Sequence, residues 1–280
     1  MSKPADSYII RPDPADPRLT ERVSGIDQTG QRIDTSVTVE RALTIFLNGQ
    51  EIVTAMTIND YPEYLAIGYL LNQHMLLPDD EVTGVDYDEE LSVVVVRTRR
   101  KTNYEKKLKK KVQTSGCAQG TVFGDLMEEI DAVQLRDDVA LEEETLFALL
   151  DAVRRHETVY KNAGAVHGCA LAAGADIIYF IEDVGRHNAV DAIAGQMWLD
   201  GVDGSDKIFY TTGRLTSEMV IKAAQMRIPF LVSRSGLTQM GFEVAHKVGI
   251  TMFGRAVNRH YLLFTGRHRF VKTVAPTMLA

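Results

Sequence analysis

Cys117 is the residue whose surroundings best suit nucleophilic chemistry. It stands between Gly116 and Gly120, in a stretch without hydrophobic periodicity that predicts an exposed loop, and it follows the three lysines at 109–111 by six residues. A nearby cationic field stabilises a thiolate over a thiol, and the thiolate is the nucleophile. The pattern therefore favours a reactive cysteine. An unremarkable surface cysteine is the alternative that spacing alone leaves open.

The second cysteine, Cys169, has apolar neighbours. Ala170, Leu171 and Ala172 follow it, which favours a small buried side chain. The segment from His167 to Cys169 is similar to the first half of a zinc-deaminase signature, but that chemistry needs a glutamate two residues after the histidine and a later Pro-Cys-x-x-Cys pair, and the sequence has neither. We therefore expect no metal site, and we interpret His167 as a hydrogen-bonded packing residue.

Glycines and polar side chains gather where three apolar segments end. The sequences are EDVGRHN at 182–188, GRLTSE at 213–218 and GRAVNRH at 254–260. A glycine lets the backbone approach a ligand, an arginine offers a planar fork for phosphate, and a helix N-terminus adds aligned N–H groups. Together these features suit an anionic cofactor.

A structural interpretation of the first two turns competes with the binding one. In it, Asp183 pairs with Arg186 and Ser217 caps a helix. The sequence leaves open whether Arg186, His187 and Arg214 contact a cofactor.

The elements of the N-terminal half are predicted to be antiparallel strands and one helix. Residues 1–18 hold four prolines and are predicted to be a flexible tail. Asn48-Gly49 is a strong hairpin signal, and Asp60 as a helix N-cap followed by Pro62 predicts a helix over about 61–76. The predicted strands are Val37–Phe46, Glu51–Ile58, Val82–Tyr87 and Leu91–Thr98. A mobile loop that carries Cys117 is expected at 113–135.

From about residue 141, helices and strands alternate. The expected strands are Ile177–Ile181, Ile208–Thr212, Phe230–Ser233, Ile250–Phe253 and a final, antiparallel edge strand Tyr261–Thr265, and the expected helices are Asn188–Leu199, Ser217–Met226 and Gln239–Val248. Short, continuous apolar strands are buried on both faces, so we predict a mostly parallel sheet covered by helices. The fold class is α/β, with a smaller α+β subdomain at 19–112 and the α/β subdomain at 136–280.

Composition and charge restrict the class of protein. The chain has 280 residues, 45% of them apolar and 25% charged, which excludes a collagen, a disulfide scaffold and a disordered protein. No apolar run approaches the roughly 18 residues of a membrane helix and no secretory segment is evident, so we expect a cytoplasmic protein without a membrane partner. The net charge of −7 argues against nucleic acid as a partner. Nine basic residues and a single acid between Arg97 and Lys111 form either a solvated segment or a surface that attracts anionic partners.

Several segments, in this order, resemble the FdhD family of formate dehydrogenase accessory sulfurtransferases. The run EDVGRHNAVD at 182–191 and the pair of segments GR at 213–214 and SEMV at 217–220 carry the resemblance most specifically. The other matching stretches are FLNG at 46–49, MT at 56–57, SGC at 115–117, GAVH at 164–167, KAA at 222–224, SRS at 233–235 and GIT at 249–251. The resemblance spans about residues 37–266.

The resemblance implies sulfur delivery. In this family a cysteine desulfurase hands sulfur to the accessory protein as a cysteine persulfide, and the accessory protein sulfurates the bis(molybdopterin guanine dinucleotide) form of the molybdenum cofactor before its insertion into formate dehydrogenase. The resemblance also implies a cytidine deaminase-like fold. It maps the sulfur carrier to Cys117 and the cofactor-binding stretch to Arg255, Ala256, Val257, Asn258, Arg259 and His260.

The sequence departs from the family pattern in three places. Gly120 replaces the second cysteine of a Cys-x-x-Cys loop, so an internal disulfide that resolves the persulfide is excluded. Ala192 replaces a familiar lysine, and Val257 to His260 replace a turn with glycine and proline, so the cofactor stretch is mapped by position rather than by identity. A cofactor-binding chaperone that never carries sulfur is therefore the alternative function. The sequence leaves a homodimer open.

Overall fold

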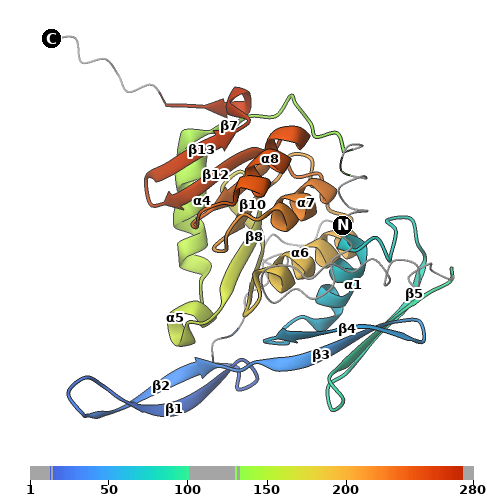
Figure 1. Ribbon diagram of the computed structural model, residues 1–280, viewed down its shortest axis with the longest axis vertical. Helices are drawn as coiled ribbons and strands as arrows, with labels where there is room; N and C mark the ends of the chain where they lie inside the picture. The colour runs from blue at the N-terminus through green and yellow to red at the C-terminus, as the bar shows by residue number, and fades with distance from the viewer. Residues whose placement is uncertain (1–12, 14, 101–129, 131–132, 274–280) are drawn as a thin grey trace.

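The N-terminal half consists of a two-stranded ribbon and a four-stranded sheet. The computed structural model describes residues 13, 15–100, 130 and 133–273. Strands β1 (Thr20–Ile26) and β2 (Arg32–Thr38) form the antiparallel ribbon, which projects from the body of the molecule in Figure 1. Strands β3 (Arg41–Leu47), β4 (Gln50–Thr57), β5 (Val82–Asp88) and β6 (Val93–Thr98) form the sheet in the order β4-β3-β6-β5. Helix α1 (Pro62–Asn72) connects β4 to β5.

The predicted hairpin at Asn48-Gly49 is confirmed as β3 and β4, and the predicted strands Val82–Tyr87 and Leu91–Thr98 form the antiparallel pair β5 and β6, with corrected boundaries. Asn48 lies in the two-residue turn between β3 and β4 with φ 56°, a left-handed conformation that asparagine tolerates better than most residues. The predicted strand Val37–Phe46 is divided between β2 and β3, because the chain leaves the ribbon at Val39 and Glu40 to enter the sheet. The predicted helix is also shorter, and its N-cap is Tyr61 without a side-chain bond rather than Asp60.

The C-terminal half contains a six-stranded sheet in the order β13-β12-β11-β10-β8-β9. Its strands are β8 (His167–Ala173), β9 (Asp176–Asp183), β10 (Ile208–Thr211), β11 (Phe230–Ser233), β12 (Thr251–Val257) and β13 (His260–Thr265). The antiparallel edge strand is confirmed as β13. The prediction of a mostly parallel sheet is wrong, because only β10 with β11 and β11 with β12 pair in parallel. Strand β8, which lies between β9 and β10, was not predicted from the sequence. Its glycine and alanines have little strand propensity.

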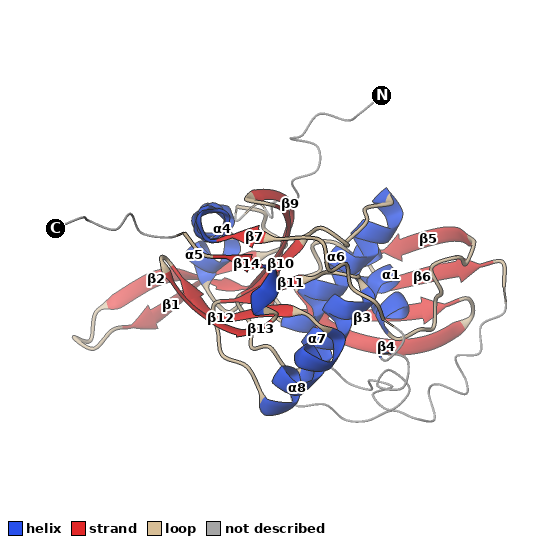
Figure 2. Ribbon diagram, turned by 90° about the horizontal axis from the view of Figure 1, so that it is seen from above, coloured by secondary structure: helices blue, strands red, loops and turns tan. Residues whose placement is uncertain are grey.

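Helices cover both faces of this sheet (Figure 2). Helices α6 (Arg186–Asp200), α7 (Ser217–Gln225) and α8 (Gln239–Val248) share one hydrophobic core with Cys169 and Leu171. Helix α4 (Glu143–His156) packs on the opposite face with Ala170 and Ala172, as the alternation of side chains along β8 requires. The remaining elements are α5 (Val159–Ala163), η3 (Arg267–Arg269) and the short parallel pair β7 (Leu141–Glu142) and β14 (Phe270–Val271). No helix in the described parts of the chain is long and apolar enough to cross a membrane.

Helices α1 and α6 cross at two glycines. A Cβ on Gly195 would lie 2.0 Å from the Tyr64 carbonyl oxygen, and a Cβ on Gly68 would lie 1.6 Å from the Asp191 carbonyl oxygen. Real Cβ atoms do not approach backbone so closely, so only glycine allows these backbones to touch. The crossing joins the two halves, because one hydrophobic core runs from Leu43 and Leu47 of the first sheet to Ile193 of α6.

We expect Gly195→Ala to lower the free energy of unfolding by about 3 kcal/mol, because the added methyl group forces the two helices apart. The higher helix propensity of alanine, about 1 kcal/mol, offsets only part of this loss. Urea unfolding measures the change, and Gly25→Ala, where a Cβ meets nothing within 4 Å, serves as the control. An equal effect of both substitutions would contradict the close crossing.

Candidate functional site

Four arginines lie at or just after the carboxyl ends of the four strands that end at one edge of the C-terminal sheet. Strands β9, β10, β11 and β12 run in the same direction, since β8 is antiparallel to both β9 and β10. Arg186, Arg214 and Arg234 follow the first three strands, and Arg255 lies near the end of β12. We call these four residues the arginine row. The structure thus brings together the two turns and the segment 254–260 that were predicted separately as binding segments. It adds Arg234, for which no ligand contact was predicted.

Backbone contacts hold neighbouring loops of the row together. The N–H of Arg234 donates to the Thr211 carbonyl at 3.1 Å, and the N–H of Arg255 donates to the Ser235 carbonyl at 2.8 Å. A Cβ on Gly213 would lie 2.6 Å from Cδ of Arg186, so the buried Arg186 side chain packs directly on the glycine backbone. The spacing of the arginines is therefore set by the sheet and not by flexible loops.

The arginines differ in how they are paired. Arg234 forms an ion pair with Glu157 at 2.9 Å and its guanidinium lies 5.0 Å from the centre of the Tyr160 ring. Arg214 is exposed and forms no ion pair with the described residues. Its positive charge is therefore available to an anion in solvent.

His167 lies at the start of β8, beside the row. Its Nδ1 is 3.3 Å from Oγ1 of Thr212. Burial lowers the pKa of His167, and the positive charges of Arg186, Arg214 and Arg234 lower it further. A neutral imidazole is the result, which can donate one hydrogen bond and accept another. The Thr212 contact agrees with the prediction that His167 is a hydrogen-bonded packing residue. The order of the strands also places His167 near three arginines, for which the sequence carries no local signal.

Asp183 does not pair with Arg186, so that part of the structural interpretation is wrong. Its Oδ2 accepts from the hydroxyl of Thr57 and from the N–H of Ile58 at 3.3 Å, and its Oδ1 accepts from Gly185 N at 2.9 Å and Asn188 Nδ2 at 2.8 Å. The carboxylate therefore ties the end of β4 to the turn before α6. Burial raises the pKa of Asp183 to about 6 against the opposing effect of these donors.

The neighbouring acid, Glu182, has a similar structural role. It is fully buried and accepts from the N–H groups of Thr158, Val159 and Tyr160 at 2.8–3.1 Å. These are the first N–H groups of α5, so a side chain from β9 satisfies the start of that short helix. Ser217 likewise does not cap α7, whose N-cap is Thr216 without a side-chain bond.

The predicted cofactor stretch, Arg255 to His260, is a tight β-hairpin rather than an open loop. Val257 pairs with His260, and Asn258 and Arg259 form the turn. Arg255 and Asn258 have φ values of 51° and 53°, the first at an irregularity in the pairing of β12 with β13. Ala256 is buried, and the other five side chains are exposed. The Arg259 guanidinium lies 3.5 Å from Glu144 and 5.0 Å from the centre of the Phe147 ring.

A buried charged cluster lies behind the row, between α6 and α7. Lys222 Nζ is 2.8 Å from Asp191 Oδ2. The other carboxylate oxygen, Asp191 Oδ1, accepts a hydrogen bond from the side chain of Asn72 in α1 at 2.6 Å. His187 Nε2 is 3.5 Å from Glu218 Oε2. Burial lowers the pKa of His187 to about 2, and the positive charges of Lys222 and Arg186 act in the same direction. His187 is therefore neutral in the folded protein despite the neighbouring carboxylate.

The two cysteines have different outcomes. Cys117 and the lysines at 109–111 lie outside the described residues. Cys169 is fully buried, as predicted, and its Sγ donates to Oγ1 of Thr211 at 3.3 Å. Burial raises the pKa of the Cys169 thiol to about 12, so the reactive thiolate form is suppressed there.

The neutral state of His187 predicts a pH-dependent stability. The unfolded chain binds a proton at His187 below about pH 6.5 and the folded chain does not, so stability falls as the pH falls. Between about pH 7.5 and pH 5 this group lowers the free energy of unfolding by about 2 kcal/mol. The free energy of unfolding of His187→Gln, measured with urea, should lack that part of the pH dependence. The free energy of unfolding of the exposed control His246→Gln should keep it. An unchanged dependence in His187→Gln would show that the imidazole titrates normally.

Comparisons with known proteins place this architecture in one family. The model of the FdhD/NarQ family matches residues 38–271. A sulfur carrier protein FdhD of Listeria monocytogenes serotype 4b is 30% identical over 229 residues, which cover 81% of this chain and 88% of the relative. The sulfur carrier protein FdhD of Bacillus subtilis is 28% identical over 239 residues, which cover 85% of this chain and 91% of that protein.

A solved structure agrees with the fold. The crystal structure of a protein from Desulfotalea psychrophila, assigned as a formate dehydrogenase accessory protein, matches with a TM-score of 0.73 and 23% identity over 90% of this chain and 99% of that chain. At that identity the match supports the mixed α/β fold alone. The match of the family model over most of the chain decides the affiliation: this chain belongs to the FdhD/NarQ family.

Proposed function

We propose that this protein is a sulfur carrier that serves formate dehydrogenase. The proposal rests on the relatives named sulfur carrier protein FdhD, with which this chain aligns over more than four fifths of its length. The observation that carries it in this structure is the arginine row, a fixed set of cations at one edge of the sheet in a protein of net charge −7. Such a row suits an anionic cofactor that bears phosphates.

The proposed reaction is a sulfur transfer through Cys117. The Cys117 thiolate attacks the terminal sulfur of a persulfide on a cysteine desulfurase. A sulfur–sulfur bond to Cys117 forms as the bond to the desulfurase cysteine breaks, and that cysteine leaves as a thiolate. The protein is thus a sulfurtransferase with a cysteine persulfide intermediate, and the lysines at 109–111 favour the thiolate.

The proposed acceptor is the bis(molybdopterin guanine dinucleotide) form of the molybdenum cofactor, bound as cargo. Its phosphates would lie against the hairpin from Arg255 to His260, where Arg255 and Arg259 are exposed. Arg255 adjoins Ser235 and so continues the arginine row, which would extend the anionic site toward Arg214. Sulfur delivery would precede insertion of the cofactor into formate dehydrogenase in the cytoplasm. We also propose that the six-stranded sheet is related to that of cytidine deaminases.

A cofactor chaperone that carries no sulfur is the alternative. The observation in its favour is Gly120, which removes a second thiol from the loop. Cys169 does not replace that thiol, because it is fully buried beneath the edge of the sheet. The two functions differ in what they require of Cys117.

We expect Cys117→Ser to abolish activation of formate dehydrogenase in a deletion strain, because a hydroxyl group cannot carry sulfur as a persulfide. Mass spectrometry after incubation with a desulfurase and cysteine should show a gain of one sulfur on the Cys117 peptide of the wild-type protein. Full dehydrogenase activity with the serine variant would favour the chaperone.

Cys169→Ala is the matched control. It removes the other thiol and should retain activation, with a loss of about 1–2 kcal/mol in the free energy of unfolding because the site is buried. A persulfide found mainly on Cys169 would reverse the assignment.

We expect the double variant Arg255→Ala with Arg259→Ala to bind GDP, a fragment of the cofactor, at least about tenfold more weakly, because charge-assisted hydrogen bonds to phosphate are lost. Calorimetric titration measures the affinity. Arg267→Ala is the control, since Arg267 is also exposed but follows β13 at the opposite edge of the sheet. An unchanged affinity in the double variant would move the site to Arg186, His187 and Arg214.

A further inference from the structure

Tyr160 of α5 carries an exposed aromatic ring on a backbone that buried groups hold in place. The residue is 42% exposed. Its N–H donates to Oε1 of the fully buried Glu182 at 3.1 Å, and its carbonyl accepts from the N–H of Gly164 at 2.9 Å. The preceding residue, Val159, is fully buried in a small hydrophobic core. The position of the ring is therefore set by the packing beneath it, although the ring itself is open to solvent.

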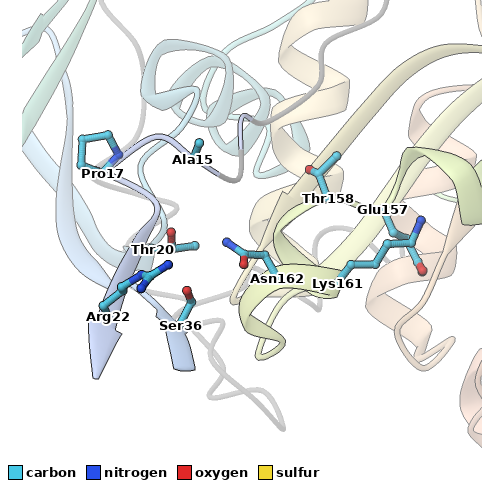
Figure 3. A pocket seen from close by; sticks show the side chains of 9 residues that line it. All are labelled: Ala15, Pro17, Thr20, Arg22, Ser36, Glu157, Thr158, Lys161 and Asn162. Carbon is cyan, nitrogen blue, oxygen red and sulfur yellow. The ribbon is translucent and has the colours of Figure 1, made fainter. Parts of the chain in front are cut away.

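The Tyr160 side chain lies on the side of α5 that faces the arginine row. Figure 3 shows Asn162 directed from α5 toward Thr20 and Ser36 of the β1–β2 ribbon. Side chains two residues apart in a helix point in directions that differ by about 200°, so Tyr160 lies on the side away from the ribbon. On that side the guanidinium of Arg234 lies 5.0 Å from the centre of the ring. The fold thus brings an exposed aromatic ring to the row.

The Arg234 side chain is held at both of its ends. Its NH1 donates to Oε1 of Glu157 at 2.9 Å, and this carboxylate is only 6% exposed. Its backbone N–H donates to the Thr211 carbonyl at 3.1 Å. The Arg234 side chain nevertheless remains 32% exposed. Because a guanidinium is planar and stacks on aromatic faces, Arg234 and Tyr160 together form a fixed, flat and positively charged surface. We call this pair of residues the stacking pair.

The stacking pair lies between two exposed cations of the arginine row. Arg234 follows β11, which lies between β10 and β12 in the sheet. Arg214 follows β10 and Arg255 lies near the end of β12, and both are exposed. Neighbouring strands are about 4.8 Å apart, so each of these arginines starts one strand away from Arg234. A ligand whose phosphates bind the exposed arginines would therefore reach the stacking pair with its remaining part.

The chemistry of the stacking pair indicates a planar heterocycle. Aromatic side chains and arginine planes stack on the π face of any base. We propose that Tyr160 and Arg234 form the stacking surface for the flat bicyclic ring of the cofactor, guanine or pterin, and that Tyr160 determines the preference for a ring-bearing ligand. This inference rests on the proposed function, because it takes the arginine row as the phosphate site.

Calorimetric titration of the full chain with three diphosphates tests the stacking pair. The probes are GDP, 6-hydroxymethylpterin diphosphate and inorganic pyrophosphate, which has no ring. At least one ring-bearing probe should bind about fivefold more tightly than pyrophosphate or better, because stacking adds to the phosphate contacts. Tighter binding of GDP would identify guanine as the stacked ring, and tighter binding of the pterin compound would identify the pterin.

Tyr160→Leu should weaken binding of the preferred ring-bearing probe at least about fivefold and leave pyrophosphate binding unchanged. Unchanged pyrophosphate binding also shows that the variant is folded. Tyr160→Phe is the matched control, because it keeps the ring, and it should bind all three probes as the wild type does.

Three results would overturn the stacking pair while the proposed phosphate site stands. They are equal affinities of the wild type for all three diphosphates, full affinity of Tyr160→Leu for the ring-bearing probe, and an equal loss of pyrophosphate binding in that variant. Failure of all three probes to bind the wild type would instead contradict the proposed cofactor site, and the stacking pair with it. The Cys117→Ser result is independent of these outcomes.

Discussion

The contact of two helix backbones at Gly68 and Gly195 is the constraint on which the arrangement of this protein depends. At this crossing α1 of the first half lies directly on α6 of the second, so the four-stranded sheet is held against the helical layer of the six-stranded one. The buried pair of Asp191 and Lys222 adds to it, since Asn72 of α1 donates to the same carboxylate. Removing one partner of such a buried pair leaves an uncompensated charge, so loss of either side chain should be strongly destabilising.

Two acids near the edge of the sheet, Asp183 and Glu182, have structural partners, and Arg214 stays without an ion pair among the described residues. Asp183 binds the end of β4, and Glu182 satisfies the first N–H groups of α5. Both carboxylates accept hydrogen bonds from N–H and hydroxyl donors, and neither forms an ion pair with Arg214. This separation of roles explains how a protein with an excess of acidic residues presents a positive edge.

The run EDVGRHNAVD at 182–191, which carries much of the family resemblance, contains both structural residues and a residue at the arginine row. Asp183, Asn188 and Asp191 make buried structural contacts, whereas Arg186 reaches the edge of the sheet over Gly213. His187 is held neutral within the charged cluster. A segment that looks like a binding motif in sequence is therefore largely a connection between the two halves, with one arginine at the proposed site.

Most local elements, and the types of side chain available for chemistry, can be predicted from the amino-acid sequence alone. Strand β11 and helix α8 have the predicted bounds, because continuous apolar runs and a 3.6-residue period are local signals. The tertiary structure alone decided which partners the polar side chains take. Asp183 pairs with Thr57, 126 residues away, instead of with the adjacent Arg186, because its burial beside β4 offers donors that no sequence spacing reveals. It also decided that β8 lies antiparallel between β9 and β10, which brings His167 beside three arginines, and that the ring of Tyr160 lies against Arg234. These outcomes depend on strand order and on the packing of distant segments, for which a single sequence carries no local signal.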